Sequence, residues 1–339
     1  MTQPPAPSPR RAFSVAGVVA TALGLSLLVW VVMRVGVAEI AADVQKVGWG
    51  LAVIVALGGL RFLLRAAAWR LCLDPPHKLR LKDAFTAVIC GDAIGNLTPL
   101  GPLVGEPAKA AFVRGRVALA PALTALAIEN VVYTLSAAAM ISAGMVALLV
   151  RFQLPPDVRG VGELAIAGTF ALFIAALWIL WRQPALISRA LGLVPPLRKH
   201  AVRIQQMENE IYTFASRHRR ALPRLAAAEA GFHALGVAEM YLTLWLLSDG
   251  GPILFYAFLF ETANRLITVV FKVVPLRLGV DEVGTAWFAT IIGLPYNTGL
   301  AIAIIRKARM LFWAAAGGVL LVREGLSGRT RTVHIPSAD

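Results

Sequence analysis

Long apolar stretches constrain the fold of this chain more than any other feature. Six of them each hold about 20 residues or more, at 13–33, 49–71, 119–150, 162–181, 222–247 and 299–322. About 20 apolar residues in a helix cross the roughly 30 Å hydrocarbon core of a bilayer. Only 15% of the 339 residues are charged, whereas a water-soluble domain usually has about 25% to cover its surface. The sequence therefore predicts an all-α polytopic membrane protein with about six spanning helices.

The first apolar stretch begins like a signal peptide, with Arg10 and Arg11 before it. It is longer than a typical signal core of about 7–15 residues, and no A-x-A cleavage site ends it. We therefore expect a retained helix, preceded by a disordered tail at residues 1–12. The rest of the chain is expected to form a single transmembrane domain at 13–325, followed by a cytoplasmic tail at 326–339.

Positive charge predicts how the chain is oriented. The formal net charge is +14, and residues 182–224 hold nine arginine or lysine residues against Glu208 and Glu210. Cytoplasmic loops of membrane proteins carry such an excess, so we expect this segment and both termini to be cytoplasmic. Residues 183–221 mix charged and apolar side chains, as amphipathic helices on membrane surfaces do. The charge fits anionic lipid head groups, and nucleic acid is not an expected partner.

Two further stretches, 83–117 and 252–295, are apolar but interrupted by Pro, Gly and charged residues. In the first, residues 83–95 make a helix of about 20 Å, too short to cross the bilayer. We expect the chain to enter the membrane, break at 96–107 and return through a half-helix that starts at Pro107, a favoured first position. Broken backbone at membrane depth is tolerated only where protein shields it or a wet cavity adjoins it, so the break predicts the site. For 252–295, a re-entrant hairpin and two full crossings both remain open.

A constant offset of 176 residues relates the two interrupted stretches. It aligns, without gaps, Pro99-Leu100 with Pro275-Leu276, Glu106 with Glu282, and Phe112 with Phe288. The helices before and after each break then correspond, in halves of about 49–150 and 222–322, and the charge argument gives them opposite senses. This is the pattern of an inverted repeat, and such repeats with discontinuous helices place a binding site near the midplane of the membrane.

Several arginines lie within the predicted spans, and three of them are candidates for a site. Arg61 and Arg65 are one helical turn apart in the second stretch, and Arg306 lies inside the last. A central arginine costs about 2.5–3.5 kcal/mol on the insertion scale, so these must face protein or water. One interpretation is that their planar guanidinium groups bind a lipid phosphate. The alternative is pairing with buried acids such as Glu129 or Glu239, or extension of Arg65 to the interface.

The acids near the breaks also have two interpretations. Glu106 can satisfy free N–H groups at a helix start, or bind the cationic part of a head group or carry a proton, and Glu282 has the same alternatives. Glu129, in the middle of a span, implies a polar interior whether it is paired or neutral. The expected substrate-binding residues are Arg61, Arg65, Asn96, Glu106, Lys109, Glu129, Arg277, Glu282 and Arg306.

Catalytic and metal-binding patterns are not found in the sequence. Cys72 and Cys90 fall in or beside apolar stretches, and no C-x-x-C or H-E-x-x-H spacing occurs. No nucleophile and base are paired by their spacing. We therefore expect no catalytic residue, no bound metal and no cofactor.

These residues resemble a known family. The motifs are Arg61, Arg65, Trp69 and Arg70 in one span, then Gly95-Asn96-Leu-Thr-Pro99, Gly105-Glu106-Pro107 and Glu129, and later Pro275, Gly279 and Glu282. Together they resemble the lysylphosphatidylglycerol synthase transmembrane-region family, over about residues 13–325. The resemblance implies a flippase-like protein of the bacterial inner membrane. Its best-known members carry a soluble aminoacyl-transfer domain, which we do not expect in a chain that ends at Asp339.

Departures from the family pattern bear on the substrate more than on the fold. Family members tend to have a compact Gly-Gly before the first acid, where this chain has Gly101-Pro-Leu-Val-Gly105, and an arginine after the third-helix acid, where it has Asn130. We expect a lipid flippase or transporter, with membrane lipids, in particular anionic phospholipid, as partners. The alternative is a non-transporting scaffold of a lipid-synthesis pathway. A lipid-modifying enzyme and a second copy of the chain are further candidate partners.

Overall fold

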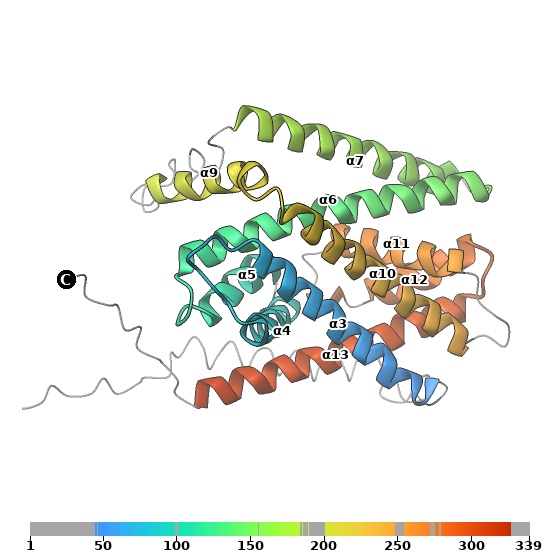
Figure 1. Ribbon diagram of the computed structural model, residues 1–339. Helices are drawn as coiled ribbons and strands as arrows, with labels where there is room; N and C mark the ends of the chain where they lie inside the picture. Colours follow the sequence, from blue (N-terminus) through green and yellow to red (C-terminus); the bar gives the residue numbers. More distant parts are fainter. Residues whose placement is uncertain are drawn as a thin grey trace, which may run out of the picture.

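The computed structural model describes residues 47–98, 101–154, 156–183, 201–247, 254–271, 275–277 and 279–326, with positions 45, 185 and 189. This part of the chain is all helical, which confirms the predicted fold class (Figure 1). The predicted helix at 13–33 and both predicted tails lie outside the described residues, apart from residue 326. The helices are α3 Gly50–Leu71, α4 Leu81–Leu97, α5 Gly101–Phe112, α6 Leu119–Arg151, α7 Pro156–Arg182, α9 Ala201–Arg217, α10 Leu222–Leu247, α11 Leu254–Val270, the 3₁₀ turn η2 Pro275–Arg277, α12 Val280–Ile291 and α13 Tyr296–Leu326.

Four helices are long and apolar enough to cross a membrane, and they coincide with predicted spans. They are Gly50–Leu71, Leu119–Arg151, Pro156–Ile179 and Leu222–Leu247. The last predicted span, 299–322, is helical within the 31-residue α13 but is more polar, because Arg306, Lys307 and Arg309 lie in its first half. The chain is a membrane-embedded protein. Among the four, α7 is buried least, with only 11% of its apolar window covered by protein.

The first interrupted stretch forms a hairpin of two short helices, α4 and α5, that pack through glycines. A Cβ placed on Gly91 would lie 2.8 Å from the Gly105 carbonyl oxygen and would overlap Lys109. A Cβ on Gly95 would lie 3.1 Å from the Gly101 carbonyl oxygen. With 17 and 12 residues, the helices measure about 26 and 18 Å, so neither spans the bilayer alone.

The predicted start of the returning half-helix was wrong. It begins at Gly101, and Pro107 lies inside α5 instead of opening it. The close packing of Gly101 and Gly105 against α4 explains the early start, because it holds the backbone N-terminal to Pro107 in place. Proline lacks an N–H to donate to the carbonyl four residues back, which here belongs to Leu103, whose side chain is exposed. Glu106 therefore lies within the helix and not at its N-terminus.

Replacing Gly91 by alanine is expected to destabilise the protein. The added methyl group has no room between Lys109 and the Gly105 carbonyl, and overpacking of this kind costs about 1–3 kcal/mol. Gly168 of α7 is the matched control, because nothing lies within 4 Å of its Cβ position and alanine is the better helix former. Thermal unfolding in detergent should show a lower midpoint for Gly91→Ala alone; equal midpoints would contradict the tight hairpin.

The second interrupted stretch repeats this arrangement with α11, η2 and α12. Its break has left-handed backbone at Leu276 (φ 51°), Arg277 (φ 47°) and Gly279 (φ 74°). Such angles cost free energy in residues other than glycine, so surrounding contacts must hold them. Leu276 is buried at 1% exposure, and its carbonyl oxygen accepts a hydrogen bond from Lys307 Nζ at 2.6 Å.

The two halves of the chain have corresponding helices and contacts. Each helix of the series α3 to α6 has a counterpart of similar length in the series α10 to α13. The helix contacts of the first series recur in the second. Contacts of α3 with α4, α4 with α5 and α5 with α6 correspond to those of α10 with α11, α11 with α12 and α12 with α13. Contacts of α3 with α6 and of α4 with α13 correspond to those of α10 with α13 and of α11 with α6. Corresponding helices α3 and α10 lie side by side and antiparallel (Figure 1), because Gly50 faces Leu246 while Gly231 faces Leu64.

A layer of buried charged side chains, which includes Arg61, Glu129, Glu239 and Glu261 and which we call the polar layer, lies between apolar cores. One core gathers around Trp69 and Leu225, and a second around Phe260 and Met240. Arg61 lies in the middle of α3, between Trp69 of the first core and Ile54, which belongs to a third, smaller core with Val47 and Ile305. On α6, Glu129 likewise follows residues of the first core and precedes those of the second. Arg61 and Glu129 thus lie between the apolar ends of their helices.

Candidate functional site

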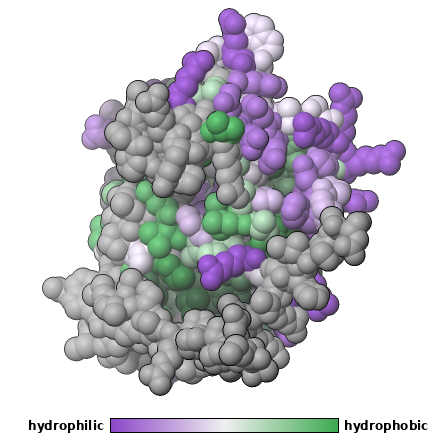
Figure 2. Space-filling model, turned by 90° about the vertical axis from the view of Figure 1, so that its left-hand side faces the viewer, coloured by the Kyte–Doolittle hydropathy of each residue, from purple (hydrophilic) through white to green (hydrophobic). Residues whose placement is uncertain are grey.

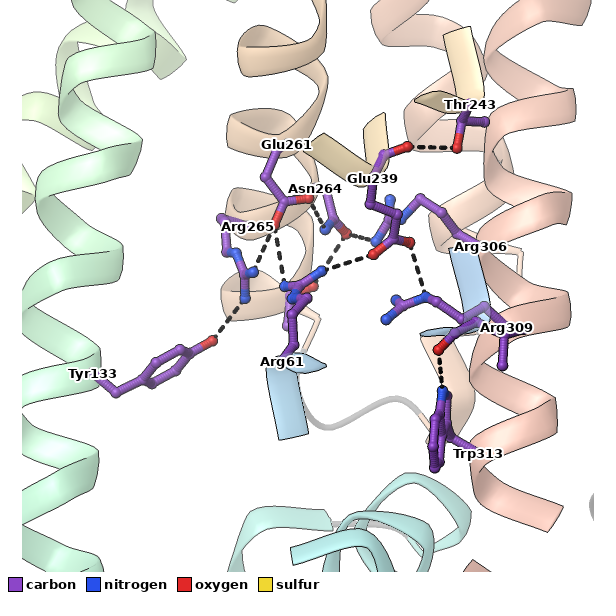
Figure 3. A network of polar contacts seen from close by, with 12 residues as sticks. Arg61, Tyr133, Glu239, Thr243, Glu261, Asn264, Arg265, Arg306, Arg309 and Trp313 are labelled. Atoms are coloured by element: carbon purple, nitrogen blue, oxygen red, sulfur yellow. Dashed lines mark hydrogen bonds and ion pairs between the residues drawn. The ribbon is translucent and has the colours of Figure 1, made fainter. Parts of the chain in front are cut away.

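The polar layer is built around Arg61, which joins the two halves of the chain (Figure 3). Its Nη1 donates to Glu239 Oε2 of α10 at 3.1 Å, and its Nη2 donates to Glu261 Oε1 of α11 at 3.3 Å. The side chains of both glutamates are 1% exposed. Charges this deep require partners, because an unpaired buried charge carries a large desolvation penalty. The predicted alternative of internal pairing is thus observed for Arg61.

Further arginines surround the same two glutamates. Arg265 Nη2 donates to Glu261 Oε1 at 2.6 Å, and its Nη1 donates to the Tyr133 hydroxyl at 3.0 Å. Arg309 Nε lies 2.8 Å from Glu239 Oε1 as an ion pair. Two carboxylates therefore form ion pairs with three guanidinium groups.

A fourth arginine, Arg306, has a neutral partner. It donates to the Asn264 side-chain oxygen, and Asn264 in turn donates to Glu261 Oε2 at 3.1 Å (Figure 3). No ion pair to Arg306 is found among the described residues. The cluster of four arginines consequently carries more positive charge than its carboxylates balance.

Arg65 forms a second ion pair, one turn along α3 from Arg61. Its Nε lies 2.7 Å from Glu129 Oε1, and its Nη2 donates to Glu129 Oε2 at 3.0 Å. The guanidinium carbon lies 4.2 Å from the centre of the Tyr133 ring, a cation–π contact. This bidentate pair and the ring contact fix the orientation of Arg65.

These arginines line a cavity of about 260 Å³ that we call the cation cavity. Its basic residues are Arg61, Arg65, Lys109, Arg265, Arg277, Arg306 and Arg309, and its acidic residues are Asp92 and Glu106. Glu129, Glu239, Glu261 and Asp281 pair with these cations but are not part of the lining. The cavity therefore presents cations with acids behind them, which is the arrangement that attracts an anion, and guanidinium groups bind phosphate through paired donors.

The first break supplies the acidic side of the cavity. Glu106 pairs with Lys109 at 2.6 Å across one turn of α5. Asn96 Nδ2 donates to Asp92 Oδ2 at 2.7 Å near the end of α4. All four line the cavity. The polar groups are thus segregated, with acids on the α4–α5 hairpin and most cations on α3, α11 and α13.

The second break contributes one cation and a buried lysine contact. Arg277 lines the cavity, and its Nε donates to Asp281 Oδ1 at 3.1 Å. Lys307, which is 1% exposed, holds both Asp281 and Glu282 at 3.2 Å. Lys307 and Glu282 are outside the cavity lining. We infer that Lys307 stabilises the backbone conformation of the break through these contacts.

Of the nine sequence-predicted site residues, seven meet at the cavity. They are Arg61, Arg65, Asn96, Glu106, Lys109, Arg277 and Arg306. Glu129 and Glu282 lie behind cations instead. The prediction did not include Asp92, Tyr133, Arg265 and Arg309, which also line the cavity. One signal was available for Arg309, which follows Arg306 by three residues and so shares its helix face. Among the described residues, no group of three or more His, Cys, Asp or Glu side chains could hold a metal ion.

Comparison with known proteins identifies the family. Residues 15–318 match the family model described as "Lysylphosphatidylglycerol synthase TM region". No curated protein and no solved structure matches the chain. The matched segment includes both hairpins and every residue of the cation cavity. The chain belongs to the lysylphosphatidylglycerol synthase TM region family.

Proposed function

We propose that this protein is a transporter that moves an anionic phospholipid between membrane leaflets, and that it is not an enzyme. The observation that carries the proposal is the lining of the cation cavity, with seven basic and two acidic side chains in the polar layer of a membrane protein. Family membership supports a role connected with membrane lipids. We also propose the bacterial inner membrane as its location.

The charge balance of the cavity supports an anionic head group. Four further acids pair from behind with five of the seven basic residues, so the cavity and its partners hold seven cations and six acids in all. One positive charge remains, and a phosphodiester carries one negative charge. Arg306 is the best candidate for that charge, because its partner Asn264 is neutral. A phosphate bound to Arg306 would balance this charge without displacing a carboxylate from its arginine partner.

Movement across the membrane is proposed to follow from the two-fold arrangement of the hairpins. Inverted repeats with broken helices expose a central site alternately to the two sides. Here the α4–α5 and α11–α12 hairpins both border the cavity, and their surrounding helix contacts correspond. In this proposal each hairpin gates one side of the membrane. Arg61, whose ion pairs with Glu239 and Glu261 link the first half to the second, holds the closed centre together.

The proposed orientation has the α9 end of the molecule in the cytoplasm. Hydrophilic side chains gather at this end (Figure 2), where α3 ends and α10 begins. Arg217, Arg219 and Arg220 lie there and are exposed. In a background with Cys72 and Cys90 changed to serine, Arg219→Cys is expected to react with a membrane-impermeant maleimide only from the cytoplasmic side. Tyr296→Cys, at the start of α13, is expected to react only from the opposite side; labelling of both from one side would refute this topology.

Transport is tested in liposomes that contain phosphatidylglycerol with a fluorescent head-group-labelled or isotopically labelled analogue. We expect the purified protein to accelerate the exchange of the anionic lipid between leaflets relative to protein-free liposomes and relative to phosphatidylcholine. Unchanged sidedness across a panel of anionic lipids would overturn the proposal.

The alternative is a non-transporting scaffold, and one observation favours it. Helix α7 is largely uncovered, with Ile174, Leu177 and Trp181 more than 60% exposed, so a partner helix or a second copy of the chain has a surface to pack on. A scaffold requires this surface and not the cavity. Arg61→Ala and Glu106→Gln would then leave the lipid pathway unchanged, while a lipid-modifying enzyme would copurify with the protein.

A further inference from the structure

A second cavity, apolar throughout, lies beside the cation cavity. It has a volume of about 550 Å³ and lies between the α6–α7 pair and the α11–α12 hairpin. Its lining includes Val161, Gly162, Ile267, Phe271, Val283 and Trp287. We call it the apolar groove.

One hairpin separates the groove from the cation cavity. On α11, Arg265 and Thr268 line the cation cavity, while Leu266 and Ile267, between them in sequence, line the groove. At the second break, Arg277 lines the cavity, and Gly279 and Val280 line the groove. A helix with its side chains is about 10–12 Å across, so the two spaces are one helix width apart. A phospholipid has its charged and apolar parts within such a distance.

The groove opens towards the hydrocarbon of the membrane. Val161, Val283 and Trp287 are 54%, 59% and 55% exposed in the protein alone. Glycine at 162 and 284 removes side chains from the walls, and a Cβ on Gly284 would lie 2.9 Å from Ile267 Cδ1. In a bilayer, the apolar material that reaches such a surface is the lipid chains, which are as apolar as leucine.

We propose that the apolar groove holds one acyl chain of the lipid whose head group occupies the cation cavity. This inference rests on the proposed function and adds to it the binding site of one acyl chain of the transported lipid. The lipid would straddle the second break, with its phosphate near Arg265 and Arg277 and its chain against Ile267 and Val283. Positive φ angles at the break turn the backbone sharply there, which lets one short segment face both spaces.

The test uses phosphatidylglycerol that carries a photoreactive diazirine in the middle of one acyl chain, in proteoliposomes of the full chain. After irradiation, mass spectrometry maps the labelled peptides. We expect labelling of α12 around Val283 and of α7 around Val161 to exceed that of the outer face of α7, which includes Ile174, by at least about fivefold.

A pair of substitutions on one helix provides the control. Val161→Trp fills the groove and is expected to lower α12 labelling about fivefold and to slow transport of long-chain phosphatidylglycerol. Leu164→Trp, three residues along α7, lies at a position that is 72% exposed and outside the groove lining. It adds the same side chain and is expected to leave both readouts unchanged.

The outcomes separate this inference from the proposed function. Equal labelling of all exposed apolar helices, with transport still sensitive to Arg306→Gln, would contradict the groove inference but not the proposed transport function. A cross-linked polypeptide in place of lipid at the groove would also overturn it. If no variant and no anionic lipid showed transport, the proposed function would fail whatever the labelling pattern.

Discussion

Replacing Glu261 by glutamine is expected to produce the largest loss of stability of any single substitution in the polar layer. Glu261 is fully buried and pairs with Arg265 at 2.6 Å and Arg61 at 3.3 Å. Without its charge, Arg265 would have no carboxylate partner among the described residues, and Arg61 and Arg309 would share Glu239 alone. Removal of one partner of a buried ion pair costs about 3–5 kcal/mol.

Thermal unfolding in detergent measures this loss. Glu210→Gln is the matched control, because Glu210 is exposed on α9 and exposed charges contribute little. The double variant Glu261→Gln/Arg265→Gln should recover part of the loss, with a coupling energy of about 0.5–3 kcal/mol, since it removes the orphaned cation as well. A Glu261→Gln protein as stable as the control would contradict the network.

Replacing Arg306 by glutamine is expected to abolish most transport and to leave the fold intact. Its partner is the neutral Asn264, so its removal leaves no carboxylate without a cation. A hydrogen bond to a charged group contributes about 1.5–3 kcal/mol, and each 1.4 kcal/mol corresponds to about a tenfold change. We therefore expect transport of phosphatidylglycerol to fall about 10- to 100-fold.

The unfolding midpoint of Arg306→Gln should stay close to that of the wild type. Arg323→Gln, in the last turn of the same helix and exposed, should transport normally. Arg306→Lys should recover part of the rate, because lysine keeps the charge but cannot bind phosphate with a planar pair of donors. Normal transport by Arg306→Gln would remove the proposed role of this residue.

The spans and the key arginines could be predicted because a single physical cost determines each. Hydrophobic length fixes a crossing helix, so the prediction of 49–71 differs from Gly50–Leu71 by one residue. The cost of a charge in hydrocarbon required Arg61, Arg65 and Arg306 to face protein or water, and all three line the cavity.

Other features depend on how helices pack, which one sequence does not reveal. The sequence shows that Glu129 and Glu282 are charged, but helix rotation decides that they lie behind Arg65 and Lys307 instead of in the cavity. Asp92 lines the cavity for the same reason. The predicted start of α5 was wrong because glycine contacts with α4 outweighed the preference of Pro107 for a first helical position.

The cation cavity is proposed to select an anionic head group. The most direct measurement is the affinity of the purified protein in neutral detergent for short-chain phosphatidylglycerol and for short-chain phosphatidylcholine, with wild type and Arg306→Gln side by side. We expect the wild type to bind phosphatidylglycerol at least about tenfold more tightly than phosphatidylcholine, and the variant to lose this preference. Equal affinities for the two lipids, or a preference that survives in Arg306→Gln, would contradict the account.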